Sequence, residues 1–274
     1  MRRFPWRLAL PLTFCMALAD SWDDDLLLLQ KELRLAQAMP NPPRWTCEDR
    51  CVPAVWVVSP GRSGSTTVLE MLNALPGFAI MGENQAMWGT LYELAKKRAG
   101  ALEEYRDRGD SMAWRQSDQL NWSEILCSYQ LRVLAEINPP NDARVVGFKE
   151  IRWAWSEQLH DLELLMEVFP CSFAVLNYRK DIEAEAESRT EATGYFPPTN
   201  LAEATKAMLR FYESHRHRSF LLPLENFSTD LFNQLLRFLG EEQCSFTEVL
   251  HDNSHSGYTR GNWRHAPDIV NCTR

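Results

Sequence analysis

Short apolar runs alternate with longer segments of helical periodicity along most of the chain. The apolar runs predict strands at 54–59, 78–82, 144–149 and 172–178. The periodic segments predict helices at 65–75, across 84–137, at 156–168 and at 181–193. Because strands that alternate with helices form βαβ units, the pattern indicates a parallel sheet. We predict an α/β fold of three layers, in which helices flank a central parallel sheet.

The N-terminal segment has the pattern of a targeting signal. Three arginines precede an apolar stretch from Leu8 to Ala19, which ends in an A-x-A-like cleavage site. The stretch is shorter than the about 20 apolar residues that a transmembrane helix needs. We predict a signal peptide at residues 1–19, with a signal anchor as the alternative. A helical stem or linker is predicted at residues 20–51, and the main domain at residues 52–274.

The charge balance argues against one class of partner. The chain has 29 basic and 37 acidic side chains, a net charge of −8, and loss of three arginines with residues 1–19 leaves 26 basic groups and −11. A protein this acidic has no electrostatic footprint for nucleic acid, so we predict no nucleic-acid partner. An anionic ligand must then be bound by a local cluster of basic groups.

The cysteines indicate an oxidising compartment. Six of them follow residue 19 and permit up to three disulfides: Cys47, Cys51, Cys127, Cys171, Cys244 and Cys272. Fifteen pairings are possible, and the spacing does not rank them. Since no second Cys/His pair at ligand spacing accompanies Cys47 and Cys51, we predict no metal site.

Three glycosylation acceptor patterns agree with exposure in the secretory pathway. They begin at Asn121, Asn226 and Asn271. We predict a glycoprotein of the secretory lumen, in the Golgi, or a secreted protein. We expect membrane attachment only if residues 1–19 remain as an anchor. The sequence does not indicate an oligomeric state.

A loop rich in glycine and hydroxyl groups follows the first predicted strand. Gly61 and Gly64 let the backbone curl so that its N–H groups converge, and the helix that begins at Ser65 adds its positive dipole end. Arg62 supplies a cation. Further donors to an anion are the hydroxyl groups of Ser63, Ser65, Thr66 and Thr67. A Walker loop has Lys directly after its second Gly, whereas Ser65 follows Gly64 here.

This order of residues resembles the 5′-phosphosulfate loop of sulfotransferases. Those enzymes bind 3′-phosphoadenosine 5′-phosphosulfate in place of a nucleoside triphosphate. The resemblance implies this nucleotide as co-substrate, without a metal, and a P-loop NTPase-like fold. It assigns residues 61–67 to the nucleotide and makes residues 52–274 a sulfotransferase domain.

Two further motifs of the family follow in the expected order. Arg179 ends the strand 172–178, and Ser188 lies in the next helix, which is similar to the unit that binds the 3′-phosphate. The usual gap is eight residues, but here it is nine, and Glu187 stands at the aligned place. Near the C-terminus, Arg260 and Gly261 best match the family's basic C-terminal lid. The resemblance runs from about Val55 to Arg264.

The catalytic residues are also assigned through the resemblance. Cytosolic sulfotransferases place Lys-x-His at the end of the third strand, and Ile151 stands at the position of that His. Glu83 is instead similar in placement to the base of tyrosylprotein sulfotransferases and of several bacterial and Golgi carbohydrate sulfotransferases. We expect Glu83 to be the general base, with Glu150 in reserve, and Lys149 to contact the transferring sulfuryl group.

The acceptor is less well specified. Aromatic side chains that suit sugar rings, but that are also common in cores, are Trp88, Tyr92, Tyr105, Trp114, Trp122, Trp153 and Trp155. The acceptor partner is predicted to be a carbohydrate, with a tyrosyl protein as the alternative. A P-loop kinase and a non-catalytic module that binds a sulfated or phosphorylated ligand are the other hypotheses.

Overall fold

The order of five parallel strands fixes where the loops of the protein meet. A computed structural model describes residues 45–46, 51–84, 89, 93, 97, 122–155, 159–194, 197–250 and 269–273. All of them belong to the compact unit Pro43–Arg274. The predicted signal segment 1–19, most of the predicted stem 20–51, and both Arg260 and Gly261 lie outside the described residues.

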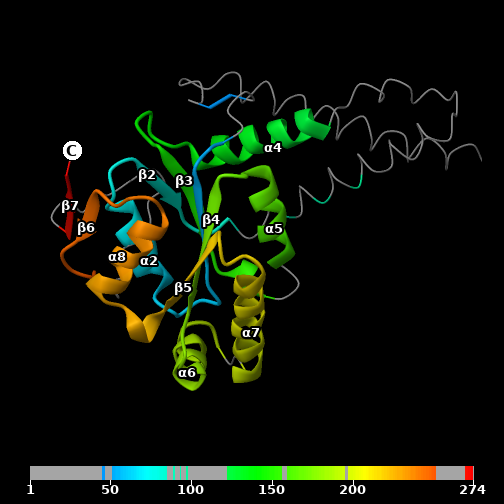
Figure 1. Cartoon of the computed structure of the whole chain (residues 1–274). Helices are drawn as coiled ribbons and strands as arrows, with labels where there is room; N and C mark the ends of the chain where they lie inside the picture. Colours follow the sequence, from blue (N-terminus) through cyan, green and yellow to red (C-terminus); the bar gives the residue numbers. More distant parts are fainter. Residues whose placement is uncertain are drawn as a thin grey trace, which may run out of the picture. The chain divides into compact units, whose positions relative to one another are not determined.

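The sheet has the order β2-β3-β1-β4-β5, with every neighbouring pair parallel (Figure 1). Its strands are β1 (Ala54–Val58), β2 (Phe78–Met81), β3 (Val145–Glu150), β4 (Ser172–Tyr178) and β5 (Ser219–Pro223). Every residue of β1 and β3 is buried. Because helices cover both faces, β1 is a continuous apolar run without alternation, and β3 has no charged residue before Lys149 and Glu150 at its end. The four predicted strands and the predicted fold class are confirmed, and β5 is an additional strand.

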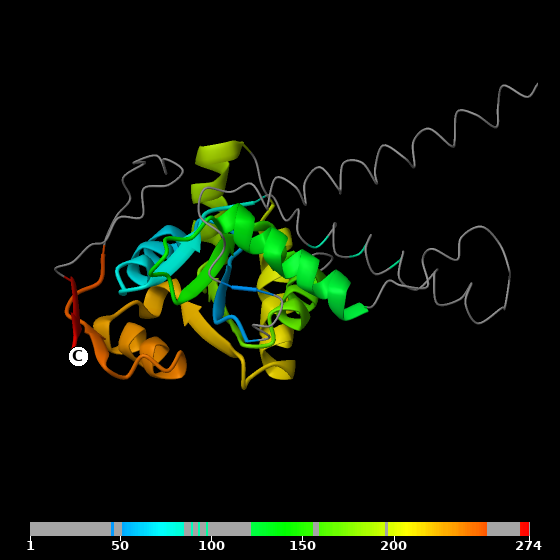
Figure 2. The same ribbon diagram turned by 90° about the horizontal axis from the view of Figure 1, so that it is seen from above.

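Helices form the two outer layers. One face is covered by α2 (Ser65–Asn73) and α8 (Thr229–Phe238), and the other by α4 (Trp122–Ile137), α5 (Leu159–Val168) and α7 (Pro198–Ser214) (Figures 1 and 2). Successive residues of β1 point to opposite faces. Trp56 therefore packs in one core, where its ring centroid lies 5.2 Å from that of Phe169, while Val55 and Val57 pack against α2 and α8 in the other.

The carboxyl edge of the sheet carries short helical segments. The helix α6 (Ile182–Thr193) follows β4 and packs beside α7 at this edge (Figure 1). Asp181 caps it, because the side chain accepts a hydrogen bond from the N–H of Ala184 at 3.0 Å. The 3-10 segments η2 (Arg152–Ala154) and η3 (Leu224–Asn226) follow β3 and β5. The loops expected to carry chemistry are therefore neighbours in space.

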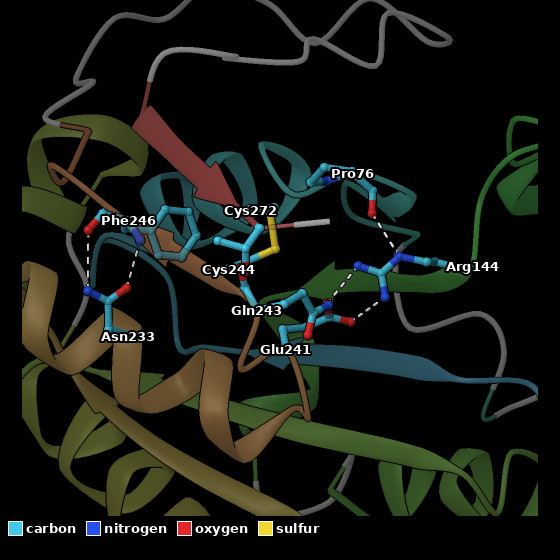
Figure 3. The surroundings of a disulfide bond; sticks show 9 residues. Pro76, Arg144, Asn233, Glu241, Gln243, Cys244, Phe246 and Cys272 are labelled. Carbon is cyan, nitrogen blue, oxygen red and sulfur yellow. Dashed lines mark hydrogen bonds and ion pairs between the residues drawn. A yellow bond between two sulfur atoms is a disulfide. The ribbon is translucent and has the colours of Figure 1, made fainter.

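An ion pair and a disulfide fasten the opposite edge (Figure 3). The short strands β6 (Cys244–Phe246) and β7 (Val270–Cys272) pair antiparallel and are joined by the Cys244–Cys272 disulfide. Both guanidinium nitrogens of Arg144 donate to the carboxylate of Glu241, and its Nε donates to the carbonyl of Pro76 at 2.9 Å. This bidentate pair joins the beginning of β3 to the segment that leads into β6.

The disulfides agree with the expected oxidising compartment. Cys51, just before β1, is joined to Cys171, just before β4, across 120 residues of sequence. Cys127 is also disulfide-bonded. Two of the pairings that the sequence left open are thereby assigned. Among the described residues, no helix combines the length and the apolar composition that crossing a bilayer requires.

A first prediction concerns the contact between β1 and β3. A Cβ at Gly147 would overlap the carbonyl oxygen of Val55 on the neighbouring strand, so Gly147→Ala must push the two strands apart. We expect the free energy of unfolding to fall by about 3 kcal/mol or more, measured by urea denaturation. Gly82→Ala is the matched control, because its Cβ would meet no atom within 4 Å. Equal stability of the two variants would contradict the packing at Gly147.

Candidate active site

The loop after β1 adopts the backbone conformation of an anion cradle. Gly61, Arg62 and Gly64 have positive φ angles of 91°, 58° and 79°. Gly64 is the N-cap of α2, and no side chain caps the helix there. The first N–H groups of α2 have no carbonyl partner within the helix, so they are available to an anion together with the positive end of the helix dipole.

A buried hydrogen-bond network holds this loop in shape. The Ser63 hydroxyl donates to Oδ1 of Asn177 at 2.8 Å, and Nδ2 of Asn177 donates to the carbonyls of Ser63 and Leu222, both at 2.9 Å. The hydroxyl groups of Ser59 and Ser63 are 2.7 Å apart. Because the Ser63 hydroxyl serves the scaffold, its backbone N–H is the group left for the predicted anion contact. Asn177 itself was not singled out from the sequence.

The remaining predicted ligands of the loop lie around its open side. Ser65 and Thr67 are buried, whereas Thr66 is half-buried and Arg62 is exposed. Nε of Arg62 donates to Oγ of Ser188 at 3.1 Å, across 126 residues of sequence. The structure therefore brings Ser188 to the loop despite the nine-residue gap after Arg179. Contacts of these residues with a nucleotide stay predictions.

Glu83 and Lys149 form an ion pair at the carboxyl ends of β2 and β3. Nζ of Lys149 lies 2.6 Å from Oε1 of Glu83, and the side chains are 8% and 34% exposed, respectively. Nη1 of Arg152 is 3.7 Å from Oε2 of the same carboxylate. Glu83 is thus held between two cations while part of its surface stays accessible.

Glu150, the reserve candidate for the base, occupies a different environment. Its side chain is fully buried. One oxygen accepts from the N–H of Arg152 at 2.9 Å and the other from the N–H of Asn84 at 2.9 Å. Glu150 therefore fixes the segments that follow β2 and β3, and its burial leaves no room for a proton exchange with an acceptor.

Two arginines, one directly after β4 and one in α6, extend the cationic region. Nη1 of Arg179 donates to the carbonyl of Ala184 at 3.2 Å. Arg189 donates to the carbonyl of Pro60 in the loop, and its guanidinium carbon lies 5.4 Å from the ring centroid of Trp155. Burial lowers the pKa of Arg189, and the carboxylates of Glu185 and Glu83 oppose that shift. Arg189 was not predicted as a site residue, although its helical spacing from Glu185 places both on one face.

Glu185 is a buried acid on the same helix. Burial raises its pKa to about 8, and the charges of Arg179 and Arg189 oppose this shift in part. Neither of its carboxyl oxygens has a hydrogen-bond partner among the described residues. Glu185 was not distinguished from the exposed acids of α6 by sequence pattern, because its burial depends on how the helix packs.

The two predicted aromatic side chains that the structure describes, Trp153 and Trp155, differ in their surroundings. Trp153 is fully buried in the core, and Trp88, Tyr92, Tyr105 and Trp114 lie outside the described residues. Trp155 is partly exposed beside Arg189. Within the described part of the chain, no group of three or more His, Cys, Asp or Glu side chains could hold a metal ion.

Comparisons with known proteins give matches only among solved structures. No protein-family profile and no curated protein matches the chain. The sulfotransferase domain from the Synechococcus PCC 7002 olefin synthase is 17% identical, with a TM-score of 0.44 over 73% of this chain and 76% of that one. A sulfotransferase from Alicyclobacillus acidocaldarius is 10% identical, with a TM-score of 0.45 over 69% and 81%.

The sulfotransferase domain from the curacin biosynthetic pathway is 18% identical, with a TM-score of 0.40 over 69% of this chain and 75% of that one. All three are sulfotransferases, the family that the sequence motifs resemble. Likeness at these scores carries no information on activity, so the functional proposal depends on the geometry of the site.

A second prediction tests the scaffold of the loop. Asn177→Ala leaves two carbonyls and one hydroxyl without their partner, so we expect a loss of about 2–4 kcal/mol in stability. We also expect roughly tenfold weaker binding of adenosine 3′,5′-bisphosphate in calorimetry, because the loop loses its fixed shape.

Asn233→Ala is the matched control for this experiment. The Asn233 amide also bridges two backbone groups, since it donates to the carbonyl of Phe246 and accepts from its N–H (Figure 3). It should lose stability without losing nucleotide affinity. If both variants bind the nucleotide equally well, Asn177 does not shape the anion site.

Proposed function

We propose that the protein is a sulfotransferase that moves a sulfuryl group from 3′-phosphoadenosine 5′-phosphosulfate to an acceptor hydroxyl. The observation that carries the proposal is the ion pair of Glu83 and Lys149, 2.6 Å apart, beside an uncapped helix N-terminus. An anion cradle, a cation and an accessible carboxylate are the groups that sulfuryl transfer requires.

The residues of the cradle suit a phosphosulfate. The uncapped N-terminus of α2 offers backbone N–H groups, and Arg62 and Ser188 lie together at the same loop. Arg179 and Arg189 add positive charge at the adjacent strand end in a chain whose net charge is −8. Such a local cluster is what an acidic protein needs to bind a multiply charged nucleotide. The nucleotide, when bound, supplies a sulfuryl group activated by its bond to a phosphate.

Glu83 is assigned the role of general base. Its carboxylate accepts the proton of the acceptor hydroxyl as the acceptor oxygen bonds to sulfur, and the sulfur–oxygen bond to the 5′-phosphate breaks with its electrons on the phosphate. Lys149 holds Oε1 of Glu83 and provides positive charge where the oxygens of the sulfuryl group gain negative charge. Arg152 supports the other oxygen of the carboxylate.

The acceptor and the compartment are assigned from an aromatic side chain and from the disulfides. We assign the acceptor to carbohydrates, since Trp155 is a partly exposed aromatic side chain near the charged groups. Tyrosyl proteins are the alternative acceptor. The Cys51–Cys171 and Cys244–Cys272 disulfides support a secretory lumen such as the Golgi, or secretion, as the place of action.

One binding experiment separates the classes of function. Calorimetry with adenosine 3′,5′-bisphosphate, with ATP and magnesium, and with a sulfated sugar should give binding of the first ligand. Preference for ATP would favour a kinase, for which the loop lacks Lys after Gly64. Binding of the sulfated sugar without turnover of the nucleotide would favour a non-catalytic module.

A third prediction tests the base. Glu83→Gln keeps the size of the side chain but cannot accept the proton, so turnover at saturating co-substrate should fall by about 10²–10⁴-fold. Affinity for adenosine 3′,5′-bisphosphate should be nearly unchanged. Glu167→Gln, an exposed position on α5, is the control and should keep full turnover.

The matching variant on β3 distinguishes the two carboxylates. Glu150→Gln should mainly lower stability, since the buried carboxylate accepts two backbone N–H groups. Near-normal turnover of Glu83→Gln together with collapse of turnover in a folded Glu150→Gln would transfer the base to β3 and contradict the proposal.

A fourth prediction concerns the 3′-phosphate. If Arg179 binds this group, Arg179→Ala should reduce the preference for the co-substrate over adenosine 5′-phosphosulfate, which lacks it, by about tenfold or more. The ratio of kcat/KM values for the two donors measures this preference. Lys180→Ala is the control at the neighbouring position. Nζ of Lys180 donates a hydrogen bond to Oδ1 of Asn226 at 2.9 Å, so we assign it no contact with the nucleotide. An unaltered ratio in Arg179→Ala would remove Arg179 from the 3′-phosphate site.

A further inference from the structure

The segment η3 lies against the loop that follows β1. It comes directly after β5, which pairs with β4 so that Pro223 stands opposite Tyr178. A Cβ added at Gly64 of the loop would lie 2.7 Å from Cδ1 of Leu224 and 3.0 Å from a ring carbon of Phe227. The first residue of η3 and the residue after η3 therefore pack on the backbone of the loop at its second glycine.

The middle and last residues of η3 bind the turn of residues 179–181, which joins β4 to α6. Oε1 of Glu225 accepts hydrogen bonds from the N–H groups of Lys180 at 2.8 Å and of Asp181 at 3.0 Å. Nζ of Lys180 donates to Oδ1 of Asn226 at 2.9 Å. Because η3 contacts the loop through apolar side chains and the turn through hydrogen bonds, it connects two segments of the proposed nucleotide site that are distant in the sequence.

Arg179, the residue assigned to the 3′-phosphate, precedes those two N–H groups in the same turn. The N–H of Lys180 belongs to the peptide group that follows Arg179, so Glu225 fixes the backbone that carries the guanidinium. Burial raises the pKa of Glu225, but the hydrogen bonds from Asp181 and Lys180, together with the charge of Arg179, lower it below its usual value. The group is therefore a carboxylate at neutral pH, and a charged acceptor makes the stronger hydrogen bonds.

Selection of a nucleotide by both of its phosphates requires support of this kind. The ribose fixes the distance between the 5′- and 3′-phosphates, so the loop and Arg179 must be held at a matching distance to bind both. Displacement of a binding group by about 1 Å is enough to lose much of its contribution. Asn177 fixes the loop through buried hydrogen bonds, and Glu225 is the corresponding support of the turn.

We propose that Glu225 is a positioning residue of the nucleotide site, which holds the turn 179–181 in place so that Arg179 selects nucleotides that carry a 3′-phosphate. This inference rests on the proposed function, because it takes a phosphorylated nucleotide as the ligand. Glu225 acts through its hydrogen bonds, since a carboxylate beside the site repels a phosphate. Its charge and its hydrogen bonds therefore have opposite effects on nucleotide affinity, and substitutions can separate them.

The fifth prediction is the test of this inference. Calorimetry of the full chain with adenosine 3′,5′-bisphosphate and with adenosine 5′-phosphate gives two dissociation constants, whose ratio measures the preference for the 3′-phosphate. Glu225→Gln keeps the length and an acceptor oxygen without the charge, so the ratio should stay within about threefold of the wild type. Glu225→Asp keeps the charge but is one methylene shorter, and Glu225→Ala loses both, so the ratio should fall about tenfold in these two variants.

Two control variants exclude lost charge and lost stability as the cause. Glu242→Ala removes an exposed acid from the segment before β6, and its ratio should equal that of the wild type. Asn233→Ala loses both contacts of its amide with the backbone of Phe246, so it should lower stability without altering the ratio. If Glu225→Ala fails to fold, the comparison of Glu225→Gln with Glu225→Asp carries the test alone.

The possible outcomes separate this inference from the proposed function. Failure of the wild type to bind adenosine 3′,5′-bisphosphate overturns the proposed function, and the inference with it. Binding without preference over adenosine 5′-phosphate overturns the inference alone, because there is then no selection for Glu225 to support. A reduced ratio in Glu225→Gln, or an unchanged ratio in Glu225→Asp, also overturns the inference alone. A ratio that is retained in Glu225→Gln and reduced in Glu225→Asp supports it.

Discussion

The carboxamide of Asn177 connects parts of the site that the chain separates by more than a hundred residues. It lies in β4, and its two donor contacts reach the carbonyls of Ser63 in the loop and Leu222 in β5. Buried amides in low-dielectric surroundings specify geometry because leaving any one partner unsatisfied is costly. The position of the loop is therefore set by the sheet itself, and Gly61 and Gly64 supply the positive φ angles of its curled backbone.

The shape of the loop in turn decides where charge accumulates. The carbonyl of Pro60 accepts from Arg189, and Arg62 contacts Ser188, so two adjacent residues of α6 meet the loop. An acidic chain gathers cations at one edge of its sheet by drawing them from β3, from the residue after β4 and from α6. Burial makes each of these charges more effective toward a ligand, because fewer water molecules screen them.

Local patterns predicted the elements that are defined by nearby residues. The apolar runs gave the first four strands because a strand buried on both faces is visible in its own sequence. The loop was visible because glycine and hydroxyl residues stand where a strand meets a helix. The end of β4 and the beginning of α6 were likewise predicted to within a residue.

Features that depend on packing were not visible in this way. β5 contains Pro223 and was not predicted as a strand, yet it pairs with β4 at the edge of the sheet, where proline is tolerated. Nothing local distinguishes Glu185 or Arg189 from the other charged residues of a helix with almost no amphipathic pattern. The contact of Arg189 with Pro60 in the loop spans 129 residues of sequence, so it cannot be read from the helix itself.

Glu83 and Glu150 illustrate how environment divides roles between similar groups. Glu83 follows β2, and Glu150 ends the neighbouring strand β3. Nη1 of Arg152 lies within 4 Å of a carboxylate oxygen of each. Glu150 is buried and accepts backbone N–H groups through both oxygens, so its carboxylate is committed to holding the segments after β2 and β3. One of those segments begins at Asn84, directly after Glu83. A buried carboxylate therefore positions the accessible one, and the candidate base depends for its orientation on a residue that takes no proton itself.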